Sequence, residues 1–420
     1  MVILEIANKI KQKGGNLYLV GGAVRDELLK REVHDQDYCI TGLSKEEFEE
    51  MFPEAFRRGK YFCVYDLENK EFALARAEKK SGIGHKEFEI ETGKNITIEQ
   101  DLARRDITIN SIAKNVLTGE IIDPFEGRKD IENKTIRATT LAFKEDPLRV
   151  YRVARFASQL RFSVETNTLK LMNDLKQELN SLSEERVFDE FRKALLSDKP
   201  STFFNVLREA NVLDVHFKEI YNLIGQTQPI KYHPEGDSYS HTMIALDNSV
   251  ELTDNPAIRF SVLVHDLGKG LTPKEMLPHH YGHDKVGEKV VSEFGKKLKI
   301  PNEWIKCGKV SAKEHMRGGI FEKMTPKKQV DFLTRVSKSK LGLDGLKIVV
   351  SCDRARLGDM PTDIKFDTIG KDMLKEINGE YIKKKYKINN EKNIGNLLRQ
   401  ERINWLKKNE KNIENLFILI

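Results

Sequence analysis

The sequence predicts an α+β protein, in which a small N-terminal α/β head precedes a chain that is almost wholly helical. Up to residue 137, short apolar or alternating segments that are typical of strands are interleaved with helical patterns. Beyond about Glu145, apolar residues recur at three- and four-residue spacing, as in 148–156 and 188–196. At 420 residues the chain is too long for one compact core, so we expect two to four domains.

Four regions follow from these changes of pattern. The looser stretch 225–229 predicts a linker into a histidine-rich region. We therefore predict an α/β head at 1–137, a helical neck at 138–228, a histidine-rich domain at 229–360 and a basic helical tail at 361–420.

Composition indicates a soluble cytoplasmic protein. Charged residues make up 32% and hydrophobic residues 39% of the chain, and four scattered cysteines form no Cys-x-x-Cys pair. We find no signal peptide pattern and no apolar run of membrane-spanning length, so we expect no membrane partner. The pattern leaves open whether the protein is a monomer or a homodimer.

The net charge of +6 is concentrated near the C-terminus, where 380–411 holds ten Lys or Arg and four Glu. Such a basic helical segment, with Tyr381, Tyr386 and Trp405, could follow a phosphate backbone. A solvated helix face has the same composition, and composition alone does not decide between the two.

The first elements of the head predict a phosphate-binding turn. Residues 17–20 are typical of a buried strand, Gly21-Gly22 of a tight turn, and 23–30 of a helix. A strand, a glycine turn and a helix N-terminus leave backbone N–H groups pointing outward, where they can bind phosphate oxygens.

Asp35 and Asp37 follow this turn and predict a magnesium site. In an extended segment 35–40 their carboxylates project to the same face, because side chains alternate along a strand. Mg²⁺ prefers carboxylates together with the phosphates of a substrate. A phosphate-binding turn beside a metal-binding pair indicates nucleotidyl transfer by the two-metal route. Further strands are expected at 62–65, 71–76 and 88–91.

Arginine and carboxylate pairs occur further along the head and neck. Arg104 and Arg105 lie beside Asp106, and their guanidinium groups suit triphosphate oxygens or a ribose. Asp146 is predicted near a helix N-terminus with Arg149 three residues later, so that an acceptor and a donor would share one helix face. That pair could recognise a nucleobase edge; a capping Asp with a surface ion pair is the alternative.

Together these motifs resemble the class II CCA-adding tRNA nucleotidyltransferases and their bacterial poly(A) polymerase relatives. The matching segments cover about 170 residues: Gly21–Asp26, Asp35-x-Asp37, Arg104-Arg105-Asp106, Asp123-Pro124-Phe125, Glu145-Asp146-x-x-Arg149 and Glu185-Arg186-Val187. The resemblance implies that Asp35 and Asp37 bind two Mg²⁺ ions and are catalytic. It also implies that the nucleotide contacts are Gly22, Arg25, Arg105, Asp146, Arg149 and Arg152.

The resemblance further implies ATP and CTP as substrates and the tRNA acceptor end as the partner. Segment 75–85 resembles the loop with which CCA-adding enzymes switch from CTP to ATP, which favours addition of the full CCA or of the terminal A. A bacterial poly(A) polymerase, or an A-adding enzyme with a separate CC-adding partner, remains the alternative within the family.

Seven of the ten histidines fall between His233 and His315, including the adjacent pair His265-Asp266. Imidazoles and carboxylates from several helices are typical of a divalent transition-metal site that activates water against a phosphate ester. His34, His85 and His216 are predicted to be structural or surface residues.

This region resembles the HD phosphohydrolase domain of the multifunctional CCA proteins. The resemblance implies the metal ligands His241, His265, Asp266 and Asp353, with Ni²⁺ or another divalent transition metal, and phosphatase, 2′-nucleotidase and 2′,3′-cyclic phosphodiesterase activity. Two alternatives stay open. The metal site could persist without activity, or the whole chain could be an HD hydrolase whose head only binds nucleotide.

Overall fold

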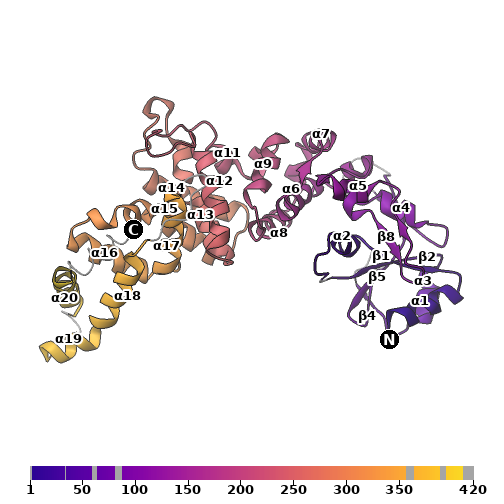
Figure 1. Cartoon of the computed structure of the whole chain (residues 1–420), viewed down its shortest axis with the longest axis horizontal. Helices are drawn as coiled ribbons and strands as arrows, with labels where there is room; N and C mark the ends of the chain where they lie inside the picture. Colours follow the sequence, from indigo (N-terminus) through magenta and orange to yellow (C-terminus); the bar gives the residue numbers. More distant parts are fainter. Residues whose placement is uncertain are drawn as a thin grey trace. The chain divides into compact units, whose positions relative to one another are not determined.

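The computed structural model describes residues 2–33, 35–58, 64–80, 88–355, 364–387 and 394–409. The chain divides into two compact units, whose elements are labelled in Figure 1. Unit 1 comprises Met1–Leu182 and Asn205–Val212, and unit 2 comprises Ser183–Phe204 and Leu213–Ile420. The chain therefore passes between the units three times.

Unit 1 is built on a seven-stranded sheet with the order β3-β4-β5-β2-β1-β8-β9. All neighbouring pairs are antiparallel except β2 and β5, which are parallel. The strands of unit 1 are β1 Asn16–Val20, β2 Asp37–Thr41, β3 Phe56–Arg58, β4 Val64–Leu67, β5 Lys70–Leu74, β6 Arg76–Lys80, β7 Phe88–Thr92, β8 Ala113–Asn115, β9 Ile121–Ile122, β10 Thr135–Ile136 and β11 Ser163–Val164. β6 pairs with β7, and β10 pairs with β11, in two small separate sheets.

Helices connect these strands and continue beyond them. They are α1 Ile3–Gln12, α2 Gly22–Leu28, α3 Lys45–Met51, α4 Ile98–Ala103, α5 Gly127–Glu132, α6 Arg149–Leu160 and α7 Thr166–Asp174, with short 3-10 helices η1 Thr108–Asn110, η2 Leu141–Glu145 and η3 Glu178–Ser181. Helix α9, Ser201–Glu209, contains residues of both units.

Local sequence explains where the head helices begin. Ser44 and Glu47 form a capping box at the start of α3, and Thr97 and Gln100 form another at the start of α4. The inward faces of α4, β1, β2 and β8 form a core cluster: Tyr18, Val20, Cys39, Ala75, Ile96, Ile98, Leu102 and Ala113. This core fixes the positions of β1 and β2, at whose ends the polar residues described below are found.

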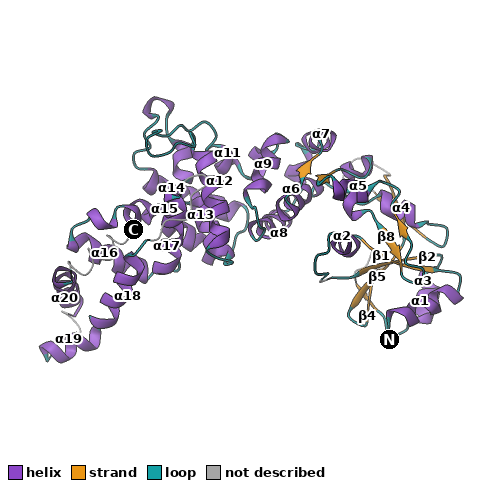
Figure 2. Cartoon of the chain, viewed as in Figure 1, coloured by secondary structure: helices purple, strands orange, loops and turns teal. Residues whose placement is uncertain are grey.

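Unit 2 is helical throughout the part of it that the structure describes, and Figure 2 draws the strands in orange in unit 1. Its helices are α8 Glu184–Leu195, α10 Leu213–His216, α11 Lys218–Tyr221, α12 Ser238–Asn248, α13 Pro256–Val264, α14 His283–Lys297, α15 Asn302–Gly319, α16 Pro326–Ser337, α17 Gly342–Arg354, α18 Phe366–Glu376, α19 Gly379–Tyr386 and α20 Ile394–Lys408. The 3-10 helices are η4 Ser249–Glu251, η5 Leu267–Leu271, η6 Lys274–Met276 and η7 Phe321–Lys323.

Two apolar clusters stabilise unit 2. Phe191, Phe203, Phe204 and Phe217 pack ring against ring, with centroids 5.3–6.3 Å apart. A larger cluster joins α16, α17, α18 and α20 through buried residues such as Phe332, Leu346 and Phe366. None of the helices in the described ranges combines the length and apolarity that crossing a bilayer requires.

The predicted fold class is confirmed, and the predicted elements at 17–20, 23–30, 148–156 and 188–196 correspond to β1, α2, α6 and α8. The segment 81–87 of the predicted specificity loop, His34, His85 and the tail residues 388–393 and 410–420 lie outside the described residues. The four predicted domain boundaries stay predictions.

Candidate functional site

The two head carboxylates lie at the start of β2. Asp37 is the first residue of that strand, Asp35 precedes it by two residues, and both are exposed. Desolvation by the surrounding protein and the Asp35 carboxylate raise the pKa of Asp37, although the Arg105 guanidinium lowers it. The pair therefore offers two open oxygen donors in a region of concentrated negative charge, which suits a hard divalent cation.

A third carboxylate, which sequence reasoning missed, lies beside Asp37. In the parallel pairing of β2 and β5, Asp37 stands opposite Glu71, and in the antiparallel pairing with β1 it stands opposite Val20. Paired residues project to the same face of a sheet, so Asp37 and Glu71 share a face. Desolvation and the Asp37 carboxylate also raise the pKa of Glu71. Only the strand order could have revealed this neighbour.

The glycine turn lies directly against Arg105. Gly21 has φ +71°, and a Cβ atom built there would lie 2.9 Å from Nη1 of Arg105. A Cβ at Gly22 would lie 3.4 Å from Nη2 of Arg25. The two glycines therefore allow two predicted nucleotide-binding guanidinium groups to approach the backbone closely.

Two carboxylates and an amide hold these guanidinium groups in place. Asp101, 1% exposed, accepts hydrogen bonds from Arg104 at 2.7 Å and from Arg105 at 3.1 Å. Asp26 accepts two hydrogen bonds from Arg25, both 2.9 Å long, and Asn110 accepts a third at 2.7 Å. Fixed arginines lose little conformational entropy when they bind an anion.

Helix α6 supplies two further arginines. Arg152 donates from Nε to Asp106 at 2.8 Å. Burial would raise the pKa of Asp106, but the guanidinium groups of Arg152 and Arg149 lower it to about 2. Arg149, which is buried, donates to the backbone carbonyls of Ala142 at 2.6 Å and Arg104 at 2.7 Å. Asp106 is thus an anchor for Arg152.

Asp146 and Arg149 do not share one helix face as expected. Asp146 has φ −130° and ψ 106° and precedes α6, and its Oδ1 accepts a hydrogen bond from the backbone N–H of Leu148 at 3.0 Å. Its carboxylate therefore contacts the backbone just ahead of α6, and its role in recognising a nucleobase stays a prediction. The Arg149 guanidinium instead bonds the carbonyls given above, because these buried acceptors require a donor.

Phe156 of α6 lies among three guanidinium groups. Those of Arg25, Arg152 and Arg155 lie 5.2, 5.5 and 3.9 Å from the centre of its ring. Cation–π attraction and the Asp106 ion pair together hold α6 arginines beside the head, within unit 1.

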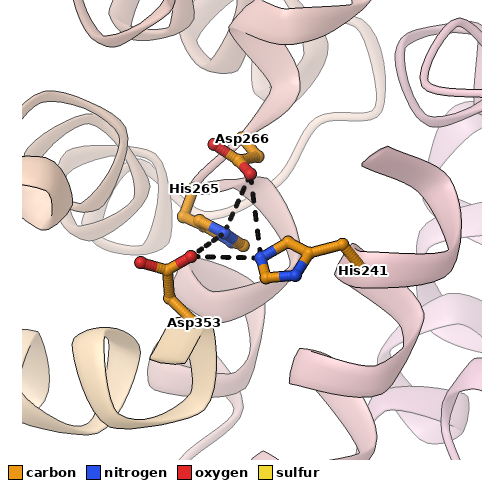
Figure 3. Close-up of side chains that lie close together, drawn as sticks. All are labelled: His241, His265, Asp266 and Asp353. Atoms are coloured by element: carbon orange, nitrogen blue, oxygen red, sulfur yellow. Dashed lines mark hydrogen bonds and ion pairs between the residues drawn. The ribbon is translucent and has the colours of Figure 1, made fainter. Parts of the chain in front are cut away.

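In unit 2, the four predicted metal ligands converge from three places in the fold (Figure 3). His241 comes from α12, His265-Asp266 from the end of α13, and Asp353 from α17. Nε2 of His241 and of His265 lie 3.0 and 3.4 Å from Oδ1 of Asp353, and 3.9 and 3.3 Å from Oδ2 of Asp266. The ligand atoms of the four residues all lie within 4.8 Å of one another.

Burial and charge in this cluster suit a cation. Burial would lower the pKa of His265, yet the Asp266 and Asp353 carboxylates raise it to about 10. Nε2 of His265 and both carboxylate oxygens of Asp266 are buried without a hydrogen bond of normal geometry in the described part of the chain. Buried nitrogen and oxygen atoms that converge in this way can serve as ligands of a divalent transition metal, so the residues fit the metal that the sequence predicts.

Two further charged residues, Glu235 and Lys269, contact these ligands and orient them, and the sequence had not indicated either one. Glu235 accepts from Nδ1 of His241 at 2.6 Å and from Nδ1 of His233 at 3.0 Å. Lys269 pairs with Oδ2 of Asp266 at 2.5 Å and donates to Gln228 at 2.6 Å. A carboxylate behind a ligating imidazole fixes its tautomer and raises its basicity.

Three family models match this chain. A poly A polymerase head domain matches residues 17–137, a probable RNA and SrmB-binding site of polymerase A matches 161–223, and an HD domain matches 238–331. The first contains the carboxylate pair and Arg105, and the third contains His241, His265 and Asp266.

Solved structures resemble the whole chain. A CCA-adding enzyme in its apo form II has a TM-score of 0.66 at 20% identity, over 100% of this chain and 96% of that one. The Thermotoga maritima CCA-adding enzyme complexed with tRNA has a TM-score of 0.65 at 20% identity, over 100% and 95%. Likeness at this identity establishes the fold.

Curated relatives establish the family. The multifunctional CCA protein of Mannheimia succiniciproducens is 43% identical over 308 residues, which cover 71% of this chain and 73% of the relative. That of Psychromonas ingrahamii is 46% identical over 295 residues, covering 68% and 71%. The carboxylate pair of the head is in place, and so is the HD cluster, formed by His241, His265, Asp266 and Asp353. This chain belongs to the family of multifunctional CCA proteins.

Proposed function

We propose that this protein builds and repairs the 3′-terminal CCA of tRNA from CTP and ATP, and that its HD cluster hydrolyses phosphate esters. Family membership supports both activities. The observation that carries the first is the exposed pair Asp35 and Asp37 at the start of β2, together with Arg105, which lies against the glycine turn after β1. Metal-binding oxygens and a fixed guanidinium then serve the same triphosphate.

In the head, Asp35 and Asp37 would hold Mg²⁺, and Glu71 would add a third carboxylate on the same face. Bound Mg²⁺ supplies Lewis-acid stabilisation of the triphosphate and lowers the pKa of the attacking 3′-hydroxyl. Arg25, Arg105 and Arg152, each fixed by a carboxylate, would bind phosphate oxygens and offset charge on the leaving pyrophosphate. Gly22 would keep this approach free of a side chain.

Base selection would depend on Asp146 and Arg149 at the start of α6. Both are already engaged by neighbouring backbone, so a nucleobase would have to share or replace those bonds. A wrong base would leave a buried donor or acceptor unpaired, which costs about 1–3 kcal/mol for each group.

In unit 2, His241, His265, Asp266 and Asp353 would hold Ni²⁺ or another divalent transition metal. Bound there, such an ion supplies Lewis-acid activation of water and of the phosphate ester. Glu235 would keep Nε2 of His241 directed at the ion, and Lys269 would bind substrate phosphate when it leaves Asp266. 2′,3′-Cyclic phosphates and 2′-nucleotides are the proposed substrates.

A stepwise extension assay tests the first activity. The full-length protein is incubated with tRNA that lacks CCA, and each nucleotide is supplied alone. We expect two additions with CTP and one further addition when ATP follows. Extension by ATP alone into a long tail would identify a poly(A) polymerase, and addition of A only to tRNA ending in CC would identify an A-adding enzyme. No extension of any tRNA would reject nucleotidyl transfer altogether.

A hydrolysis assay tests the second activity. A 2′,3′-cyclic nucleotide is incubated with the protein and Ni²⁺, Mn²⁺, Co²⁺ or Mg²⁺ in turn. We expect hydrolysis with the transition metals, because imidazole ligands favour them over Mg²⁺. Absence of hydrolysis with every metal would mean that the HD cluster lacks this activity.

A further inference from the structure

A buried asparagine of η1 lies between two arginines of the head that come from different helices. Nη1 of Arg25, on α2, donates to Oδ1 of Asn110 at 2.7 Å. Nδ2 of Asn110 in turn donates to Oδ1 of Asp106 at 3.3 Å, and Oδ2 of Asp106 accepts from Nε of Arg152, on α6, at 2.8 Å. One amide and one carboxylate therefore connect Arg25 to Arg152 by an unbroken chain of hydrogen bonds, which the sequence had not indicated.

The two neighbours of Asn110 determine which side chain can lie between them. A guanidinium group only donates, so Arg25 requires an oxygen that accepts. Asp106 is ionised near neutral pH, since its pKa is about 2, and an ionised carboxylate only accepts. The residue between them must accept on one side and donate on the other, which an amide does and a carboxylate does not. Asn110 is 6% exposed, so water has little access to replace either contact.

The ring of Phe156 makes a second connection between the same two arginines. The guanidinium carbons of Arg25 and Arg152 lie 5.2 and 5.5 Å from the centre of this ring, which is buried. The face of an aromatic ring attracts a guanidinium group and restricts its movement. Hydrogen bonds through Asn110 and the ring of Phe156 therefore both fix how the two guanidinium groups lie relative to each other.

Both guanidinium groups can still reach a ligand. Arg25 donates three hydrogen bonds in the described part of the chain, to Asp26 and Asn110, whereas a guanidinium group has five N–H donors. The Arg152 side chain is 35% exposed. Two guanidinium groups held in a fixed relation suit the oxygens of neighbouring phosphate groups, which a nucleoside triphosphate carries whatever its base.

We propose that Asn110 and Phe156 are positioning residues that hold Arg25 and Arg152 together as one clamp for the triphosphate of the incoming nucleotide. Neither positioning residue touches the nucleotide, and each acts through the two guanidinium groups. The inference rests on the proposed nucleotidyl transfer for its purpose, but binding measurements test it without any transfer. Because CTP and ATP carry the same triphosphate, the clamp contributes equally to the binding of both and adds no preference for either base.

Calorimetric titration of the full-length protein with CTP, ATP and inorganic tripolyphosphate, in Mg²⁺, provides the test. Every protein carries His265→Ala, which suppresses hydrolysis of the ligands in the HD cluster. Asn110→Asp keeps the size of the side chain but places an acceptor where Nδ2 donated to Asp106. We expect all three dissociation constants to rise by the same factor, about tenfold, because a bond between charged groups is lost and two carboxylates meet.

Asn133→Asp is the matched control, because Asn133 is exposed at the end of α5 and the substitution is the same. It should bind the three ligands as the parent protein does. Exchange of the two bridging side chains, Asp106→Asn with Asn110→Asp, places an amide against a carboxylate again with donor and acceptor reversed. This double variant should bind tripolyphosphate roughly threefold more tightly than Asn110→Asp alone.

Phe156 supplies an independent pair of variants. Phe156→Leu stays apolar but has no ring face, and should raise the three dissociation constants about threefold, while Phe156→Tyr retains the ring and should leave them unchanged. If Asn110→Asp does not fold, this pair decides alone. Equal binding by Phe156→Leu and Phe156→Tyr would then reject the clamp.

Three further outcomes would overturn the clamp. These are a parent protein that binds none of the ligands, unchanged tripolyphosphate binding in both Asn110→Asp and Phe156→Leu, or a loss confined to one of the two nucleotides. Extension of tRNA with unchanged binding in the variants would keep the proposed transferase and reject the clamp. The expected losses of binding in a protein whose parent extends no tRNA would keep the clamp and reject the transferase.

Discussion

The head and the HD cluster both gather metal-binding groups, but they present them in opposite ways. Asp35 and Asp37 are exposed at the start of a strand, and all their donor atoms are oxygens. His265 and Asp266 are 1 and 0% exposed, and they meet imidazoles from three other helices. The head site is exposed and offers only hard oxygen ligands, while the HD cluster is buried and offers both nitrogen and oxygen ligands.

This difference indicates how each metal is held. An open pair of carboxylates would bind the proposed Mg²⁺ weakly until a triphosphate completes its coordination shell, so we expect that ion to arrive with its substrate. Enclosed imidazoles and carboxylates would bind the proposed transition metal tightly without substrate, so we expect that ion to stay with the protein. The predictions below test this contrast, from the largest expected effect to the smallest.

Loss of a head carboxylate should abolish one activity and spare the other. Asp37→Ala should lower incorporation of both CTP and ATP by about 10³-fold or more, because metal stabilisation of a transition state is worth several kcal/mol. Primer extension on tRNA lacking CCA measures this loss. Cyclic phosphodiesterase activity should stay unchanged, and residual incorporation within tenfold of wild type would contradict the two-metal assignment.

The reciprocal change is made in the HD cluster. His265→Ala removes a buried ligand that faces two carboxylates, and should lower phosphodiesterase activity by more than roughly 100-fold while CCA addition continues. His279→Ala serves as the matched control. An equal loss of both activities in His265→Ala would mean that the two sites are not independent.

Chelation should separate the two kinds of binding. After dialysis against EDTA, we expect unit 2 to lose about 3–4 kcal/mol of stability, because a ligand that binds only the folded state stabilises it by an amount that rises with the logarithm of the free ligand concentration divided by Kd. Differential scanning calorimetry would show a lower melting temperature that Ni²⁺ restores and Mg²⁺ does not. A melting curve that chelation leaves unaltered would argue against a resident ion.

Base discrimination should depend on the start of α6. Arg149→Ala removes two buried hydrogen bonds and should reduce the preference for correct over incorrect nucleotides by roughly thirtyfold, about 2 kcal/mol. Arg128→Ala, which removes an exposed charge on α5, is the control. Misincorporation rates with each nucleotide measure the effect, and undiminished fidelity would remove Arg149 from base selection.

Mild acid should reduce the contribution that His216 makes to the stability of unit 2. Burial, with Lys297 nearby, lowers the pKa of His216 from 6.5 to about 4, so the unfolded chain binds more protons between these values and stability falls with pH there. At pH 5.5 this amounts to about 1.4 kcal/mol. Asp106, whose pKa is about 2, stays ionised throughout that range.

Urea unfolding at pH 7.5 and 5.5 measures the difference. His216→Gln should lose less stability than wild type over this interval. An identical pH dependence in the two proteins would show that folding leaves the pKa of His216 unchanged.

Local chemistry made the head predictable. The glycine turn, the strand before it and the carboxylates after it are contiguous in sequence, so their elements β1, α2 and β2 could be predicted directly. Glu71 could not be found in this way, because its place beside Asp37 depends on the crossover that makes β2 and β5 neighbours. The backbone contacts of Arg149 could not be predicted for a related reason, since its acceptor Arg104 lies outside α6.

The HD cluster and its surroundings likewise contain residues that local sequence predicts and one that it does not. The adjacent His265 and Asp266 are recognisable by themselves, whereas His283 is one of three histidines within five residues. Nothing local distinguishes it from His279, which stacks on an exposed tyrosine. Only the start of α14 at His283, and its packing beside α15, directs that ring toward Asp266.

The three passages of the chain between units 1 and 2 restrict how this protein can be taken apart or recombined. A single cut after Leu182 would leave 205–212, which belongs to unit 1, attached to the wrong fragment. One genetic crossover could not donate either unit complete to another gene. Units 1 and 2 are therefore inherited together, and an engineer who wants only one of them must rebuild α9 as well.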